Sequence, residues 1–210
     1  AQGAKNKKIP RRNKSIGSIF MNVQTPLQEI KKMLDPATVV RLFDLKNGDF
    51  VADFGSGNGY FVIPLAQSVA PDGKVFAIDI QRDMLDVVRA KSKLENIHNV
   101  EYIWSDLEQS NGSKLKNNFV DLVLATNILH QSDQKKAIIK EAYRILRSNG
   151  HFGLIEWETG EKANNLGPPD EMRVSKETAM KLFTGQSFSV EKEFDAGSNH
   201  YGIIFIKKEV

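Results

Sequence analysis

The amino-acid sequence predicts an α/β fold built on a doubly wound, mostly parallel sheet with helices on both faces. Short continuous apolar runs alternate with helical patterns along most of the 210 residues. Such runs are typical of strands that are buried on both faces of a parallel sheet. A glycine-rich loop at 55–59 follows the first of these runs. Near the end, two strand-like segments at 188–194 and 201–209 flank the turn DAGSN, which indicates a closing antiparallel hairpin.

Caps, turns and periodicity place the individual elements. Thr25 and Asp35 can each cap a helix, and each is followed by proline, so we expect helices over 26–34 and 36–43. Apolar residues with helical spacing predict further helices at 60–70, 82–95, 133–147 and 175–185. The intervening apolar runs predict strands at 50–54, 75–79, 100–104, 119–126 and at the end of 149–157.

Charge is distributed unevenly along the chain. The formal net charge is +3, yet residues 1–14 hold six cations and no acid, which leaves 29 − 6 = 23 cations against 26 anions for the rest. We therefore expect a basic, flexible tail over 1–18 and a single domain over 19–210. A short basic terminus is commonly just solvated, and it is also suited to bind the phosphates of nucleic acid or lipid.

Composition excludes several kinds of site. The chain contains no cysteine, which rules out disulfides, thiolate nucleophiles and cysteine-based metal sites, and we predict no metal site. No window approaches the ~18 apolar residues that a transmembrane helix needs. These features fit an intracellular protein, and we predict a cytoplasmic one. The pattern does not separate a buried helix face from a subunit interface, so it predicts no oligomeric state.

The loop after the first strand is suited to bind a ligand through its backbone. Gly55, Gly57 and Gly59 alternate with other residues, among them Ser56, and Asp53 lies two residues before the first glycine. A glycine loop between a strand and a helix directs backbone N–H groups at a ligand beyond the strand end. This loop is one residue shorter than the G-x-G-x-x-G of dinucleotide sites. Asp53 either belongs to the ligand site or is an acid that orders the loop.

Two further acids stand at strand ends, on the same edge of the predicted sheet. Asp79 ends the second strand and is suited to accept hydrogen bonds from both hydroxyls of a ribose, even if it also caps the next helix. Asp106 follows the third strand and can accept from the exocyclic amine of an adenine. The loop and the two acids together predict a ligand that contains a nucleoside and needs no phosphate.

These motifs resemble those of the seven-stranded, Rossmann-like S-adenosylmethionine-dependent methyltransferases, over roughly residues 36–208. The resemblance implies a seven-stranded sheet and S-adenosylmethionine as cofactor. It matches the loop DFGSGNG, Asp79 as the ribose acid and Asp106, beside Leu107, as the adenine-contacting acid. It also implies that Ile80 packs on the adenine and that Asn127 borders the methionine part. Within the family, the chain looks most like the group that includes ubiquinone and menaquinone methyltransferases.

The methyl acceptor is expected to bind beyond the ends of the fourth and fifth strands. In this interpretation the cofactor half spans about 36–130, and the acceptor-side elements span about 19–35 and 156–200. His130 is predicted as a catalytic base, with a loop histidine bonded to the backbone as the alternative. Glu156 is predicted to orient the acceptor, and Trp157 either walls its pocket or packs in the core. We assign His200, at the start of the last strand, no part in the site; His98 and His151 are interpreted as structural.

The predicted function is methyl transfer from S-adenosylmethionine to a small-molecule acceptor. One alternative is an RNA or ribosome methyltransferase guided by the basic residues 1–14, which we do not favour. Another is a binder of the cofactor that catalyses nothing. A nicotinamide-dependent oxidoreductase is disfavoured by the loop spacing and by the lack of a second nucleotide-binding half.

Overall fold

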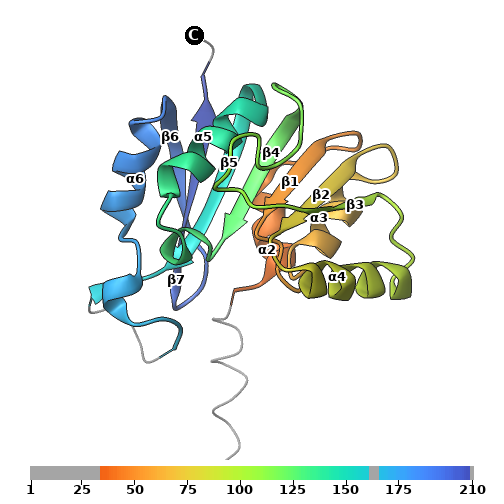
Figure 1. Ribbon diagram of the computed structural model, residues 1–210, viewed down its shortest axis with the longest axis horizontal. Coiled ribbons are helices and arrows are strands. Elements are labelled where there is room, and N and C mark those ends of the chain that lie inside the picture. Colours follow the sequence, from red (N-terminus) through yellow and green to blue (C-terminus); the bar gives the residue numbers. More distant parts are fainter. Residues whose placement is uncertain (1–33, 161–165, 209–210) are drawn as a thin grey trace, which may run out of the picture. The chain divides into compact units, whose positions relative to one another are not determined.

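The computed structural model of the protein describes residues 34–160 and 166–208 (Figure 1). The tail expected over 1–18 and the helix expected over 26–34 therefore lie outside the described residues. Within the described ranges, no helix is long and apolar enough to cross a membrane.

Seven strands form one sheet in the order β3-β2-β1-β4-β5-β7-β6. Strand β7 is antiparallel to β5 and to β6, and the other recorded pairings are parallel. This confirms the predicted doubly wound sheet with its closing hairpin. The strands are β1 (Phe50–Phe54), β2 (Lys74–Asp79), β3 (Val100–Trp104), β4 (Val120–Thr126), β5 (Leu146–Trp157), β6 (Phe188–Asp195) and β7 (His200–Lys207).

Two of the described helices, α2 (Pro36–Val40) and α6 (Lys176–Thr184), begin at a side-chain cap. Asp35 accepts hydrogen bonds from Ala37 N and Thr38 N at 3.3 and 3.2 Å, and Pro36 opens the helix. Ser175 accepts from Thr178 N at 3.2 Å. The helices are α2 (Pro36–Val40), α3 (Val62–Val69), α4 (Arg82–Leu94), α5 (Lys135–Ile145) and α6 (Lys176–Thr184), with 3-10 turns η1 (Arg41–Phe43), η2 (Leu129–Gln131) and η4 (Asp170–Met172).

The junction of α5 and β5 differs most clearly from the prediction. The helix expected over 133–147 ends at Ile145, because Leu146 already pairs with Val120 of β4. Strand β5 consequently starts at Leu146, before the segment 149–157 at whose end the sequence predicted a strand.

The sheet is covered on both faces, which explains its continuous apolar runs. Helices α2, α3 and α4 pack with one cluster of buried strand residues, which includes Val51 and Ile155. Helices α5 and α6 pack with the other cluster, which includes Phe54 and Leu154. Because successive side chains of a strand point to opposite faces, each strand contributes to both clusters.

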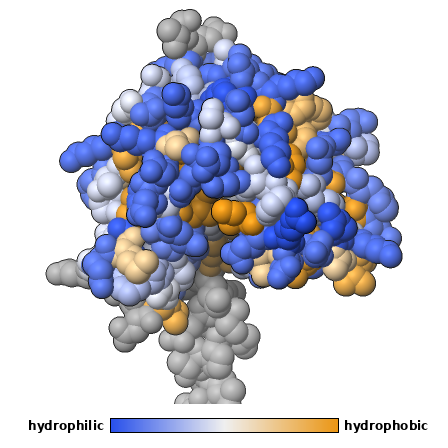
Figure 2. Space-filling view, viewed as in Figure 1, coloured by the Kyte–Doolittle hydropathy of each residue, from blue (hydrophilic) through white to orange (hydrophobic). Residues whose placement is uncertain are grey.

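The strand order reverses between β1 and β4, and in such sheets ligands bind beyond the carboxyl ends of the strands at the point of reversal. The arrowheads of β1 and β4 end at the same edge of the sheet in Figure 1. Figure 2 shows the molecule in the same view as space-filling atoms, with apolar side chains gathered at a hollow near the centre of this face.

Candidate active site

The glycine loop after β1 is held by backbone hydrogen bonds that require its unusual dihedral angles. Gly55, Gly57 and Gly59 all have positive φ, at 67°, 49° and 81°. The amides of Gly55 and Ser56 donate to Ile78 O at 2.9 and 3.1 Å, which ties the loop to the end of β2. A Cβ on Gly55 would lie 2.3 Å from Ile128 Cγ2, whereas a Cβ on Gly57 would have nothing within 4 Å. Gly57 thus leaves open space in front of the loop, where a ligand can approach the backbone.

Asp79 joins the end of β2 to this loop. Its carboxylate accepts from Gly57 N and from Gln81 N, both at 2.8 Å. The side chain is buried, and each oxygen retains a lone pair for a further donor. A cavity of about 470 Å³ opens beside it. Its lining includes the predicted residues Gly55, Gly57, Asp79, Ile80, Asp106, Leu107 and Asn127, together with Thr126, Gln131 and Ile138.

The two residues predicted near the adenine differ in character. Ile80 is 60% exposed and borders this cavity, so its side chain is available to cover a flat ring. Asp106 accepts from Glu108 N at 2.9 Å and from Gln109 Nε2 at 3.1 Å, which orders the turn after β3. Asp106 also lines the cavity.

Asp53 lies on the other side of the glycine loop and is almost fully buried. Burial, followed by the nearby charge of Asp79, raises the pKa of this carboxyl to about 8. The group is therefore mostly protonated at neutral pH in the ligand-free protein. A cationic ligand beside it would favour the ionised form, so the site is electrostatically prepared for positive charge.

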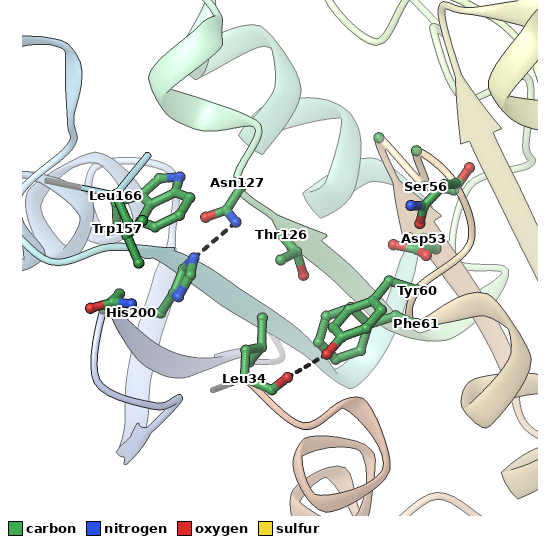
Figure 3. Close-up of a pocket in the computed structure, with 14 residues that line it drawn as sticks. Leu34, Asp53, Ser56, Tyr60, Phe61, Thr126, Asn127, Trp157, Leu166 and His200 are labelled. Atoms are coloured by element: carbon green, nitrogen blue, oxygen red, sulfur yellow. Dashed lines mark hydrogen bonds between the residues drawn. The ribbon is translucent and has the colours of Figure 1, made fainter. Parts of the chain in front are cut away.

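A second cavity of about 370 Å³ contains Asp53 and extends away from the loop. Figure 3 shows Asp53 and Ser56 at one end, Trp157, Leu166 and His200 at the other, and Thr126 and Asn127 between them. Tyr60, Phe61 and Leu34 also line it. Thr126 and Asn127 border both cavities, so the two spaces meet at the end of β4.

Three buried polar atoms at these cavities have no hydrogen-bond partner: Ser56 Oγ, Thr126 Oγ1 and Asn127 Oδ1. A buried polar atom without a partner costs about 1–3 kcal/mol, so such atoms are uncommon in folded proteins. These three atoms lie beside the glycine loop and at the end of β4, where a bound polar ligand can supply the missing hydrogen bonds.

His130 and Glu156 contact each other but line neither cavity. Glu156 is completely buried, and its carboxylate accepts from Leu129 N at 2.7 Å and from His130 Nδ1 at 2.9 Å. The reason is the alternation along β5. Trp157 points to the side of Asp53, so Glu156, one residue earlier, points to the opposite face. The catalytic role of His130 and Glu156 stays a prediction. The observed contacts of Glu156 hold the turn η2 in place.

His200 had no predicted role in the site, yet the structure places it in the cavity that contains Asp53. Asn127 Nδ2 and His200 Nε2 lie 3.0 Å apart, and the imidazole lies against the Trp157 indole with ring centroids 4.1 Å apart. Trp157 and His200 are register partners on β5 and β7. The predicted hairpin was the signal that could have placed His200 here, because it brings the start of the last strand beside the end of the fifth.

Comparison with known proteins agrees with this geometry. The profile of a family described as "Methyltransferase domain" matches residues 45–202, so the chain belongs to that family. A demethylmenaquinone methyltransferase from Lactobacillus johnsonii is 25% identical over 185 residues, which is 84% of this chain and 70% of that protein. One from Lactococcus lactis is 32% identical over 122 residues, which is 57% of this chain but 46% of the relative. The chain thus spans only about half of several curated relatives.

A solved structure gives the same picture of the fold. The crystal structure of an S-adenosylmethionine-dependent methyltransferase from Aquifex aeolicus has a TM-score of 0.76 and 26% identity, covering 84% of this chain and 91% of that one. The described chain therefore carries a class I S-adenosylmethionine-dependent methyltransferase domain, and it resembles the menaquinone-type enzymes.

The residues present fit that cofactor. The open space at Gly57 leaves the backbone approachable, and the carboxylates of Asp79 and Asp106 border one cavity. The unpartnered Ser56 Oγ, Thr126 Oγ1 and Asn127 Oδ1 supply polar atoms that a ligand can engage. The acid Asp53 suits a group that carries positive charge.

Proposed function

We propose that this domain transfers a methyl group from S-adenosylmethionine to a small-molecule acceptor. The observation that carries the proposal is the cavity containing Asp53, which continues past Thr126 and Asn127 to an aromatic end at Trp157. The glycine-loop end suits the cofactor, which leaves the Trp157 end for the acceptor. Aromatic and aliphatic walls around a few polar groups are typical of small-molecule sites.

The cofactor, when bound, supplies a methyl carbon already activated by a positively charged sulfur. The chain itself therefore has to bind, orient and exclude water. In this proposal Asp79 holds the ribose, the loop amides hold the cofactor's polar groups, and Trp157 holds the acceptor. Orienting two reactants in this way is worth up to about 7–11 kcal/mol of the barrier. In the transfer, the bond from the acceptor atom to the methyl carbon would replace the carbon–sulfur bond and leave S-adenosylhomocysteine. Any proton on the attacking atom would pass to solvent as the product leaves.

Two alternatives from the sequence remain distinct from this proposal. A binder without activity would share the cofactor site and produce no S-adenosylhomocysteine. An RNA methyltransferase would use the six cations of residues 1–14, which lie outside the described residues. The relatives that are demethylmenaquinone methyltransferases support a small acceptor, and a demethylmenaquinol is the first acceptor to try.

Calorimetric titration tests the cofactor assignment directly. S-adenosylmethionine and S-adenosylhomocysteine should bind with micromolar affinity, and NADH should not bind. Asp79→Ala should weaken binding at least tenfold, while Asp83→Ala, at an exposed position of α4, should leave it unchanged. Absence of binding in folded protein would contradict the proposal. Formation of S-adenosylhomocysteine with a demethylmenaquinol, followed by mass spectrometry, then separates an enzyme from a binder.

A further inference from the structure

Asn127 is fixed more tightly than a loop residue needs to be. Its backbone has a positive φ of 56°, its amide donates to Ile155 O at 2.8 Å, and its carbonyl accepts from Gln131 Nε2 at 2.7 Å. The side chain is held by the contact to His200. This residue stands between the two ends of the cavity that contains Asp53, as Figure 3 shows.

The contact between Asn127 and His200 defines the tautomer of the imidazole. The structure directs the Nδ2 group of the Asn127 amide at His200; in this orientation the amide donates and His200 Nε2 is the acceptor in the 3.0 Å contact. The proton of the neutral ring then resides on Nδ1. His200 is consequently an uncharged ring with a lone pair committed to Asn127 and one N–H group available as a donor.

The surroundings of His200 also keep the ring neutral. Burial, and then the positive charges of Arg173 and of His130 when protonated, lower the pKa of His200 to about 4. Glu158 and Lys176 border the outer side of the ring, together with Asp195. A neutral ring does not repel a cationic cofactor, whereas an imidazolium would.

The wall behind His200 is held together by hydrogen bonds and close packing. Arg173 donates to the carbonyls of Glu158, Pro168 and Leu166 at 2.7, 2.9 and 2.6 Å, which ties the segment after residue 166 to the end of β5. Gly167 has a φ of 83° and packs so closely that a Cβ there would lie 2.8 Å from the Trp157 indole. Trp157 and His200 therefore form a fixed pair at this end of the cavity.

We propose that His200 is the positioning residue for the methyl acceptor, which it contacts through its Nδ1–H group while Asn127 and Trp157 hold the ring in place. This inference rests on the proposed function, because it assigns the Trp157 end of the cavity to the acceptor. It replaces His130 by His200 as the histidine that meets the acceptor. The acceptor that fits is flat, carries no positive charge and presents an oxygen to the N–H group.

Nuclear magnetic resonance of the ¹⁵N-labelled full chain tests the tautomer first. The chain has only four histidines, and the His200 signals are assigned by their loss in His200→Gln. We expect the Nδ1–H tautomer, unchanged from pH 5 to pH 8. A proton on Nε2, or titration with a pKa near 6.5, would overturn the proposal.

The same spectra then report the binding of a probe. To protein saturated with S-adenosylhomocysteine, we would add 1-naphthol, which is flat and uncharged and carries one oxygen, or the cation 1-naphthylmethylammonium. We expect 1-naphthol to shift the His200 ring and the Trp157 indole N–H, with the His130 ring much less affected, and the cation to have at least tenfold lower affinity. Shifts confined to His130, or no shift at His200 with millimolar 1-naphthol, would overturn the assignment.

Variants separate the imidazole nitrogens from the aromatic surface. His200→Phe keeps a ring against Trp157 but removes both nitrogens, so it should weaken 1-naphthol at least tenfold in protein saturated with S-adenosylhomocysteine. His151→Gln, whose ring faces Glu191 at 3.1 Å elsewhere on the sheet, is the matched control. Unchanged 1-naphthol affinity in His200→Phe would refute the role. Loss of S-adenosylhomocysteine binding by the wild-type chain would instead refute the proposed function.

Discussion

Gly57 N donates to Asp79 Oδ2 at 2.8 Å, which links the glycine loop of β1 to the carboxyl end of β2. The bond fixes the loop beside the carboxylate while the front of Gly57 stays open. The two parts of the predicted nucleoside site are therefore a single hydrogen-bonded unit before any ligand arrives. A change in either residue should affect ligand binding more than the overall fold.

Alanine substitutions in the loop should separate binding from stability. In Gly57→Ala the new methyl group meets no protein atom, so the free energy of unfolding should fall only by the ~1–2 kcal/mol of a left-handed backbone. The methyl group does occupy the ligand's space, so calorimetric affinity for S-adenosylhomocysteine should fall at least tenfold.

Gly55→Ala is the contrasting variant, because its Cβ would overlap Ile128. We expect it to destabilise the protein more than Gly57→Ala, by a further ~1–3 kcal/mol in urea unfolding. Equal stability of the two variants, with equal loss of affinity, would contradict this account of the loop.

The raised pKa of Asp53 predicts a pH-dependent stability. Its folded-state pKa of about 8 lies above the ordinary value of 3.8, so the folded protein holds a proton that the unfolded chain has lost. The stability that this proton gives is present below about pH 4 and is lost as the pH rises to about 8. Asp53→Asn imitates the protonated acid, so its Tm advantage over the wild type should grow across this range, by ~10 °C or more.

The control for this prediction is Asp83→Asn, an exposed acid of α4. Its Tm should follow the wild type at every pH. A Tm difference between Asp53→Asn and the wild type that does not change between pH 4 and pH 8.5 would show that Asp53 is already ionised in the folded protein.

The parts of the site that the sequence predicted are those set by local chain order. The loop at Gly57 follows β1 and Asp79 ends β2, and parallel strands bring their carboxyl ends to one edge. Asn127 was assigned through the family resemblance, and it too stands just after a strand, β4. Such residues can be assigned from the pattern because their positions depend only on where a strand ends.

The residues at the Trp157 end of the cavity, where we propose that the acceptor binds, were harder to predict. Their positions depend on side-chain direction and on long-range strand pairing. Glu156 and Trp157 are neighbours in one strand, so only one of them can face the cavity. His200 reaches Asn127 through the antiparallel register of β5 and β7, across 73 positions of the chain. Strand boundaries in the sequence do not fix that register.

Glu156 distinguishes a supporting role from a catalytic one. Glu156→Ala leaves the buried Leu129 amide without its acceptor, so we expect the free energy of unfolding to fall by ~1–3 kcal/mol. Glu156→Gln can still accept from Leu129 N and donate to a switched tautomer of His130, so it should lose less than ~1 kcal/mol. Turnover with a demethylmenaquinol should stay within a few-fold of wild type in Glu156→Gln. A loss of a hundredfold or more at unchanged stability would restore the catalytic role that the sequence suggested.

The basic residues 1–14 give the sharpest test against a nucleic-acid substrate. If all six cations contact the phosphates of single-stranded RNA, log K should fall with log salt at a slope of about −4. We expect weak RNA binding whose salt dependence is no steeper than this slope, and we expect the binding to be lost when residues 1–14 are removed. Fluorescence anisotropy between 50 and 200 mM salt measures both. Affinity for S-adenosylmethionine should be the same with and without these residues, because none of the residues proposed to hold the cofactor belongs to 1–14. Incorporation of labelled methyl groups into RNA, abolished by the truncation, would instead establish RNA as the acceptor and assign the tail the task of holding it.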